Sequence, residues 1–304
     1  MSFEVIEATY GHKEDSSLDV IEIVREKIRD DRLAIAVTNE SFKKDPAPLK
    51  KKILKVKYEF EDETKTKYFQ EGVIAELPYP EKLIRYPSRF TLNLPEVTLC
   101  TACWGNASFL SSAAWAYKQF KDKVTFGEKI FFISENIDFS EYKEAFEDEG
   151  VQIKVLPKEY SLHSYSYLVV KELNEFVDTD FVMLFQNDGF IDNVDNWTDR
   201  FLDYDYIGAP WWYKDHNNVG NGGFSIRSKK LLETLANDKH IEKVVPEDHH
   251  ICRTYGDYLT ENHGIKFAPE ELALRFSVEH GHYKNQFGFH GSWQLEAYLR
   301  RSSS

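Results

Sequence analysis

The chain has few of the features that mark secreted or membrane-spanning proteins. Three cysteines in 304 residues cannot form a disulfide framework, which predicts a reducing compartment. Cys100 and Cys103 are spaced C-x-x-C, but no second pair or suitably placed histidine follows, so we expect buried thiols instead of a zinc site. The start, MSFEVIEATYGHKED, lacks the basic and apolar segments of a signal peptide, and no apolar run approaches membrane-spanning length. We therefore expect a soluble, cytoplasmic protein without a transmembrane segment.

An excess of basic charge is also missing. With 38 Lys and Arg against 51 Asp and Glu, the formal net charge is −13. Nonspecific nucleic-acid binding requires a basic surface, so no nucleic-acid partner is expected. An acidic balance does not exclude a nucleotide, because a divalent metal can join phosphate to a carboxylate. Aromatic residues make up 15% of the chain, and a surplus of this kind often lines sites for sugars or nucleobases as well as the core.

The length suggests two domains. Residues 1–80 contain apolar/polar alternation, clearest in Ile53–Phe60, and predict a small β-rich domain. Residues 81–95 are rich in proline and predict a linker. In residues 96–300 strands alternate with helices, which predicts a mixed, mostly parallel α/β sheet with helices on both faces. The expected elements are strands at 97–102, 129–134, 152–156 and 181–186 and helices at 107–120, 139–149 and 164–176.

The run FVMLFQNDGF at 181–190 is the most informative segment. Its first half is apolar, as in a strand buried on both faces of a sheet. The strand is then followed by Asp188, at the edge where open α/β sheets bind ligands. The alternative is an ordinary Asp-Gly turn.

Three further segments contain residues suited to chemistry. The glycine cluster in Val219–Ser225 can bring backbone close to a ligand, or it can be a flexible turn. Pro246 followed by Glu247 and Asp248 predicts a helix start, where acids also act as mere dipole complements. His290 lies in the glycine-flanked turn FGFHG, and a lone histidine of this kind is more often structural than a ligand.

Taken together, residues 97–293 resemble nucleotide-sugar glycosyltransferases of the GT-A fold. Within that fold they most resemble a bacterial and viral family of glycosyltransferase-like proteins still catalogued as a domain of unknown function. The resemblance rests on the FVMLFQNDGF strand, the segment FLDYDYIGAPW at 201–211, the glycine cluster, PED at 246–248 and FGFHG at 287–291.

The resemblance implies roles for particular residues. Asp188 and His290 would hold Mn²⁺ or Mg²⁺ against the donor diphosphate, although Gln186 replaces the first carboxylate of the usual Asp-x-Asp motif. Asp248 would be the catalytic base, with Glu247 as the second candidate. Contacts with the donor would come from Thr101, Ser134, Glu135, Tyr165, Ser166, Asn187, Gly222 and Gly223.

The function implied is a metal-dependent, inverting glycosyltransferase that uses a nucleoside-diphosphate sugar, with UDP as the expected nucleotide. The acceptor would be a glycan or a lipid-linked saccharide, and a lipid-linked acceptor would bring peripheral contact with a membrane. Retention of configuration stays open, as does a catalytically silent protein that only binds sugars or sugar nucleotides, which Gln186 suggests. Trp211 and Trp212 could stack on a sugar or pack at the sheet edge.

The first 80 residues resemble a domain at the C-terminus of some mitochondrial J-proteins. The resemblance rests on Tyr10-Gly11, Val37–Phe42 and Leu54–Phe60, and the His-Pro-Asp triplet of a J-domain is absent from the sequence. This similarity implies an accessory β module that recruits an acceptor or a partner. A scaffold built around that module, with a vestigial α/β domain, is a third interpretation.

Overall fold

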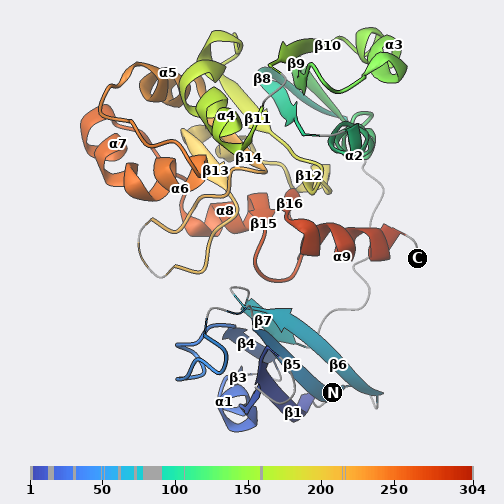
Figure 1. Cartoon of the computed structure of the whole chain (residues 1–304), viewed down its shortest axis with the longest axis vertical. Coiled ribbons are helices and arrows are strands. Elements are labelled where there is room, and N and C mark those ends of the chain that lie inside the picture. The colour runs from blue at the N-terminus through green and yellow to red at the C-terminus, as the bar shows by residue number, and fades with distance from the viewer. Residues whose placement is uncertain are drawn as a thin grey trace. The chain divides into compact units, whose positions relative to one another are not determined.

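A computed structural model describes residues 3–12, 17–29, 32–48, 50, 52–60, 63–71, 74–77, 91–105, 107–157, 160–213, 215 and 217–302 (Figure 1). The chain forms two compact units, Met1–Leu83 with His280–His282, and Ile84–Glu279 with Tyr283–Ser304. None of the described helices is long and apolar enough to cross a membrane.

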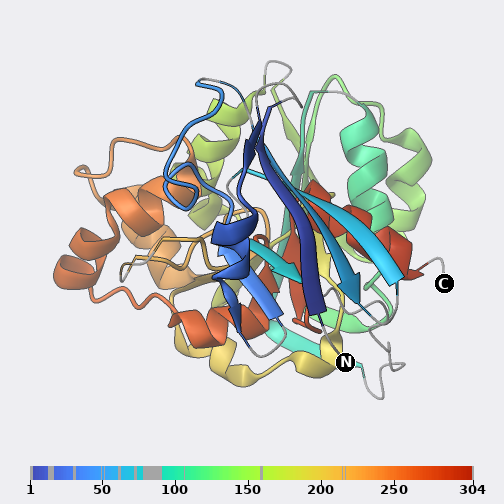
Figure 2. The same ribbon diagram turned by 90° about the horizontal axis from the view of Figure 1, so that it is seen from below.

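The N-terminal unit is built from two antiparallel sheets, with strand orders β2-β1-β5-β6 and β3-β4-β7. The neighbouring strands of the larger sheet are visible in Figure 2. In β5 the alternating residues Leu54, Val56 and Tyr58 are buried, which is the pattern that the alternation predicted. The elements are β1 Phe3–Gly11, β2 Ser17–Asp19, α1 Ile21–Arg25, β3 Ile28–Arg29, β4 Arg32–Ala36, β5 Ile53–Phe60, β6 Glu63–Gln70 and β7 Ile74–Leu77.

Most of the predicted linker, residues 81–90, lies outside the described residues. Strand β8, Leu92–Cys103, begins within residues 91–95, the described part of the predicted linker. Its first residues alternate between buried and exposed positions, with Leu92 and Leu94 buried, as expected of a strand. Pro95 falls where the register with β9 shifts, between Leu94 and Thr98, so its missing N–H does not interrupt the pairing on either side.

The second unit contains a six-stranded sheet of order β10-β9-β8-β11-β14-β13. Strands β10 Val151–Leu156, β9 Val124–Ser134, β8 and β11 Phe181–Leu184 are parallel neighbours. Strands β14 Ser225–Ser228 and β13 Tyr206–Gly208 add antiparallel pairs. The prediction of a mixed, mostly parallel α/β sheet preceded by a small β-rich domain is confirmed.

Helices cover both faces of this sheet, because alternate strand residues point to opposite sides. Phe132 packs with residues of α4 Leu162–Tyr167 and the π turn that follows it, Leu168–Glu172. Its neighbour Phe131 instead contacts Tyr117 of α2 Ala107–Lys118 and Phe146 of α3 Ser140–Asp148. The three cysteines are buried free thiols, as expected.

A small three-stranded sheet shapes the edge at which β11 ends. Strand β12 Gly189–Ile191 pairs with β16 Gly288–His290, and β16 pairs with β15 Ser277–Val278. Segments about a hundred residues apart in sequence therefore meet directly after the central strand. The remaining elements are the 3₁₀ turns 173–175, 194–196 and 199–203, the helices α5 Lys229–Asn237, α6 Glu247–His249, α7 Gly256–His263, α8 Glu270–Phe276 and α9 Ser292–Ser302, and the π turn 250–254.

The helix predicted at 164–176 differs from the observed one in its internal structure. The α-helical hydrogen bonds stop at Tyr167, a π turn follows, and a 3₁₀ turn at Leu173–Glu175 ends the segment. Hydrophobic periodicity does not report such an insertion, because the buried face continues through Leu168, Val169 and Val170.

Replacement of Gly127 tests the close approach of backbone that accompanies the shifted register. A Cβ at Gly127 would lie 2.0 Å from the carbonyl oxygen of Pro95. We expect Gly127→Ala to lower the free energy of unfolding by about 3 kcal/mol or more, measured by urea denaturation. Gly150→Ala is the control, because Gly150 has φ +68° and no neighbouring atom within 4 Å, so only backbone strain of about 1 kcal/mol is expected. Equal losses in the two variants would contradict the contact.

Candidate functional site

The turn after β11 brings Asp188 and His290 together. Asn187 and Asp188 are the central residues of a tight turn in which Gln186 and Gly189 exchange two backbone hydrogen bonds of 2.9 and 3.1 Å. Gly189 pairs with His290 across β12 and β16, and the Gly291 N–H donates to the Asp188 carbonyl at 2.8 Å. Asp188 Oδ1 consequently lies 3.6 Å from His290 Nε2. The turn named as the alternative is therefore present, and the role of Asp188 as a cation ligand stays a prediction.

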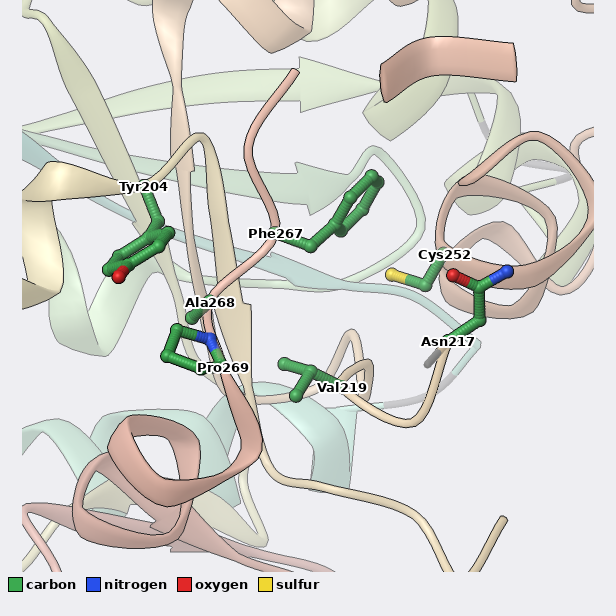
Figure 3. A pocket seen from close by; sticks show the side chains of 7 residues that line it. All are labelled: Tyr204, Asn217, Val219, Cys252, Phe267, Ala268 and Pro269. Carbon is green, nitrogen blue, oxygen red and sulfur yellow. The ribbon is translucent and has the colours of Figure 1, made fainter. Parts of the chain in front are cut away.

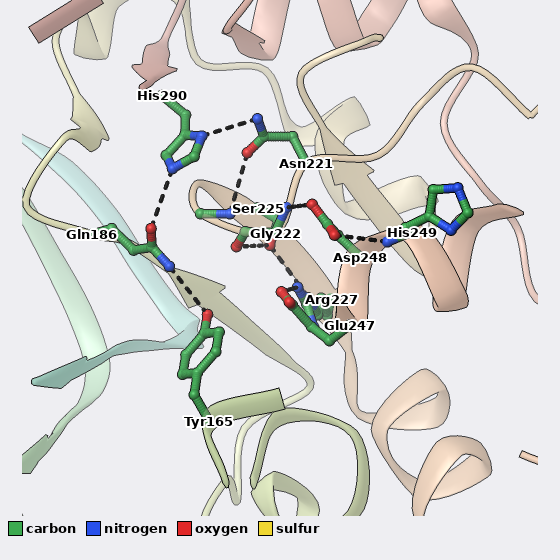
Figure 4. Close-up of polar contacts among 11 residues, drawn as sticks. Tyr165, Gln186, Asn221, Gly222, Ser225, Arg227, Glu247, Asp248, His249 and His290 are labelled. Atoms are coloured by element: carbon green, nitrogen blue, oxygen red, sulfur yellow. Dashed lines mark hydrogen bonds and ion pairs between the residues drawn. The ribbon is translucent and has the colours of Figure 1, made fainter. Parts of the chain in front are cut away.

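His290 is surrounded by polar groups on both ring nitrogens (Figure 4). Nε2 is 3.2 Å from Gln186 Oε1, while Nδ1 is 3.0 Å from the Asn221 amide nitrogen and 3.3 Å from Glu279 Oε1. The Asn221 amide can donate only to an unprotonated Nδ1, whereas Glu279 can accept only from a protonated one. Burial lowers the pKa of His290, but the hydrogen bond and charge of Glu279, aided by Asp188 and Asp248, outweigh it and raise the pKa.

The glycine cluster lies directly against the functional side chains. A Cβ on Gly223 would be 2.0 Å from His290 Nε2, and one on Gly222 would be 1.9 Å from Glu247 Oε1. Asn221, which precedes these two glycines, has φ +65°, a left-handed conformation that asparagine adopts more readily than most residues. Its carbonyl oxygen Oδ1 accepts from the Gly223 N–H at 3.2 Å. Absence of side chains is therefore what allows this loop to be part of the site.

Asp248 is held at the start of α6, which begins at Glu247 as predicted. Its Oδ2 accepts a 3.0 Å hydrogen bond from the Gly222 N–H, and its Oδ1 accepts a 2.7 Å bond from the His249 N–H (Figure 4). The residue is only partly buried. A carboxylate that is oriented by two N–H groups and still reached by solvent can accept a proton from a bound hydroxyl.

Glu247 has a different environment from Asp248. Its side chain is 6% exposed and its Oε1 lies 3.1 Å from Nη2 of Arg227, whose side chain is fully buried. Burial raises the pKa of Glu247, the charge of Asp248 adds to this effect, and Arg227 opposes it. Arg227 also donates from Nε to Ser225 at 3.3 Å and lies over the Tyr206 ring at 5.1 Å. Glu247 is therefore engaged in an internal ion pair.

The expected donor contacts do not form one group. Gly222 and Gly223 lie against Glu247 and His290, as described above. Thr101 and Asn187 line a small cavity of about 30 Å³ together with Gln186, Trp104 and Phe109. The Tyr165 hydroxyl accepts from Gln186 at 3.4 Å, and its ring stacks on Trp104 at 4.9 Å. Outside this group Ser134 and Ser166 are fully buried with hydroxyls that have no partner, and Glu135 is exposed.

A larger cavity has a volume of about 250 Å³ (Figure 3). It contains none of the expected site residues. Its lining consists of Tyr204, Asn217, Val219, Cys252, Phe267, Ala268 and Pro269.

Three residues of the site were not predicted as functional from the sequence. Glu279 and Asn221 contact His290, and Arg227 pairs with Glu247. Arg227 had no signal in the sequence, since β14, Ser225–Ser228, contains only one apolar residue and was not predicted as a strand. Glu279 and Asn221 had none, because their partner is set by pairing of β12 with β16.

The site does not contain a ready-made cluster of acidic, histidine or cysteine ligands. No group of three or more such residues that could hold a metal occurs in the part of the chain that the structure describes. Asp188 and His290 form a pair, with the amide oxygen of Gln186 as a further oxygen beside His290.

Comparison with known proteins adds a family match and distant structural likenesses. Residues 150–290 match the family described as "Protein of unknown function (DUF5672)". No curated protein matches the chain. Among solved structures, a mannosyltransferase of Pyrobaculum calidifontis in complex with GDP-mannose and Mn²⁺ is 11% identical, with a TM-score of 0.39, and covers 61% of this chain.

Two other likenesses are of the same kind. The glycosyltransferase GlyE of Streptococcus pneumoniae is 12% identical over 56% of this chain, with a TM-score of 0.37. Galactosyltransferase LgtC, solved with donor and acceptor sugar analogues, is 14% identical over 68% of this chain and 95% of its own, with a TM-score of 0.38. This chain covers only 58% of the mannosyltransferase and 44% of GlyE. The low scores leave the function to be argued from the residues of the site.

Removal of the buried arginine tests the Arg227–Glu247 pair. Arg227→Met would leave a buried carboxylate without its partner, so we expect a loss of about 3–5 kcal/mol in the free energy of unfolding. Lys55→Met is the control, because it breaks the more exposed 2.9 Å pair with Glu7, which should contribute under about 1 kcal/mol. Urea denaturation of both variants measures the difference, and similar losses would contradict a structural role for the buried pair.

The raised pKa of His290 predicts a pH-dependent contribution to stability. A pKa raised in the folded state gives stabilisation that is complete below the unfolded value of about 6.5 and is lost as the pH rises through the folded value. In metal-free buffer, the stability difference between the natural chain and His290→Gln should shrink as the pH rises from about 6 to about 8.5. His163→Gln, at an exposed position of α4, should show no such trend. A pH-independent difference for His290→Gln would refute the assignment.

Proposed function

We propose that this protein is a glycosyltransferase of the GT-A type that transfers a sugar from a nucleoside diphosphate to an acceptor hydroxyl. The observation that carries the proposal is the convergence of three segments on the glycine loop. Gly222 holds Asp248, Gly223 lies against His290, and His290 is beside Asp188. A base, a pair of cation ligands and a backbone surface without side chains are the parts that this reaction requires.

Asp248 is the base in this proposal. Its two N–H donors fix the carboxylate, and its partial exposure leaves it accessible to an acceptor hydroxyl. The proton of that hydroxyl would pass to Asp248 as the oxygen forms its bond to the anomeric carbon and the diphosphate leaves. This direct displacement inverts the configuration. Glu247 is paired with Arg227 and, in this proposal, takes no proton from the acceptor.

Asp188 and His290 fit one side of a hard divalent cation, Mn²⁺ or Mg²⁺. Such ions accept one carboxylate and complete their coordination with water and phosphate oxygens, so a cluster of three protein ligands is not needed. The side chains of Asp188 and His290 are 24% and 18% exposed, which leaves one side open to a ligand. When bound, the cation would offset the charge of the leaving diphosphate. Glu279 would orient His290 by accepting a hydrogen bond from Nδ1, and Nε2 would exchange its contact with Gln186 for the cation.

The donor is proposed to be a UDP-sugar, with its nucleoside near Thr101, Trp104 and Tyr165 at the ends of β8 and α4. The stacked rings of Trp104 and Tyr165 give this region an aromatic wall.

The acceptor is a glycan or lipid-linked saccharide, and we place the protein in the cytoplasm. The N-terminal unit is proposed as an accessory module that recruits the acceptor or a partner. Unchanged transfer after deletion of residues 1–80 would contradict that role.

One observation favours a second candidate, a protein that binds sugar nucleotides without turnover. Gln186 occupies the place of the first acid, and its amide oxygen is the group 3.2 Å from His290 Nε2. In such a protein this contact would be permanent. Tight UDP-sugar binding in the presence of Mn²⁺, without transfer or hydrolysis, would support this second candidate.

Two substitutions separate binding from chemistry. Asp188→Ala should abolish the Mn²⁺-dependent increase in UDP affinity, measured by titration calorimetry. Asp248→Asn should leave that affinity unchanged and lower the rate of UDP release by about 10²–10⁴-fold, because an amide cannot accept the proton. Asp178→Asn, an exposed substitution of the same kind, is the control for both. Turnover at the normal rate in Asp248→Asn would refute the assignment of the base.

A further inference from the structure

Three consecutive aromatic residues, Trp211, Trp212 and Tyr213, follow β13 beside the proposed base. The Trp211 ring covers the glycine loop, since a Cβ on Gly220 would lie 2.0 Å from the ring. The same ring is 6.4 Å from the ring of His249, centroid to centroid. Gly220 is two residues before Gly222, which holds Asp248, and His249 directly follows Asp248. Trp211 therefore lies against the glycine loop that holds Asp248 and near the residue that follows it.

The Tyr213 ring is held in place by Arg253, which lies in the segment that follows Asp248. The guanidinium of Arg253 lies 3.6 Å from the centre of the Tyr213 ring. Arg253 is fixed in turn by two hydrogen bonds to Asp215, of 3.0 and 2.8 Å, and by one of 2.7 Å to the Asn217 carbonyl. Because the guanidinium both stacks on the Tyr213 ring and hydrogen-bonds to the Asp215 carboxylate, the motion of the ring and of the guanidinium is restricted.

Trp212 is the exposed member of this arrangement. Its ring lies 5.4 Å from that of Tyr213 at an angle of 31°, and 37% of the residue is exposed. Keeping a large apolar ring both ordered and accessible has a cost, which a ligand that covers the ring would offset. The C–H face of a pyranose ring matches such a surface, because it is apolar and slightly positive whereas the aromatic face is slightly negative.

We propose that the platform formed by Trp212 and Tyr213 binds the acceptor saccharide by stacking against its sugar ring. The Trp211 ring lies at 85° to that of Tyr213 and is therefore not part of the stacking surface. This inference rests on the proposed function and names the acceptor as a saccharide at a defined place. A general base must lie within hydrogen-bond reach of the hydroxyl that it deprotonates. A sugar ring on this platform presents its hydroxyls at its edge, and Trp211, next to Trp212 in the chain, lies on the loop that holds Asp248. Arg253 is a positioning residue in this arrangement, because it acts through the Tyr213 ring.

A second surface offers the natural comparison. A cavity of about 250 Å³ between α2 and α9 also contains an indole, and its lining is Ser111, Ser112, Trp115, Asn187, Leu295 and Leu299. Trp293 on α9 is 41% exposed, close to the exposure of Trp212. This cavity reaches the site through Asn187, beside Asp188, and not through the base. The two exposed tryptophans therefore form a matched pair for an experiment.

Direct binding can be observed by ¹⁹F NMR of the full chain labelled with 5-fluorotryptophan, in which the six tryptophans give separate resonances. Trp→Phe variants assign them. The probes are methyl glycosides of glucose, galactose, mannose and N-acetylglucosamine, added without donor. We expect at least one glycoside to shift the Trp212 resonance in a saturable manner and to leave the Trp293 resonance in place. Shifts confined to Trp293 or Trp115, or no shift with any glycoside, would overturn the proposal.

Kinetics supply the second measurement. With the glycoside that binds as acceptor, Trp212→Ala should raise the acceptor KM about tenfold. Trp293→Ala should leave both the acceptor KM and the hydrolysis of UDP-sugar unchanged. Arg253→Met should raise the acceptor KM less than Trp212→Ala does, and the fluorotryptophan spectrum of each variant shows whether it is folded. An unchanged acceptor KM in Trp212→Ala would overturn the proposal.

The outcomes separate this proposal from the function on which it rests. Saturable shifts of Trp212 in a chain that turns over no UDP-sugar would contradict the transferase and retain the saccharide platform. Hydrolysis of UDP-sugars without any shift of Trp212 would retain the transferase and remove the platform.

Discussion

The site depends on how closely the backbone of residues 220–223 approaches the side chains around it. Trp211, Glu247 and His290 each occupy the space where a Cβ of Gly220, Gly222 or Gly223 would lie. The same loop donates the Gly222 N–H to Asp248 and places Asn221 against His290. Residues from three other segments of the chain are thus positioned by one stretch of backbone. Any side chain added there would displace the groups that the proposed reaction uses.

Much of the fold could be predicted because its signals are local. The apolar run at 181–184 and the alternation at 53–60 each report burial of neighbouring residues, and both strands form where expected. Less local features were missed. Strand β9 begins at Val124, before the predicted Lys129, since its first half pairs with the start of β8 across an irregular register. The π turns were missed because they leave the buried face of the helix intact.

For the site, the sequence indicated which residues meet but not what each does there. The turn chemistry at Asp188 and the glycine-flanked His290 were visible, and pairing of β12 with β16 brings them within 3.6 Å. Adjacent acids at 247 and 248 could not be told apart by type. Burial separates them, because one carboxylate is paired with Arg227 inside the sheet and the other remains partly exposed. The partner of Glu247 is twenty positions away, so spacing alone could not identify it.

Two helices near the site, those that begin at Leu162 and Glu247, pass from α-helical to π-helical geometry within a few residues of Tyr165 and Asp248. A π turn holds one residue more than an α turn, so everything after it is rotated by about 100° relative to an uninterrupted helix. Deleting a single residue from 168–172 or from 250–254 would restore the regular winding and turn the following side chains to another face. These stretches would thus tolerate substitution far better than any change in length.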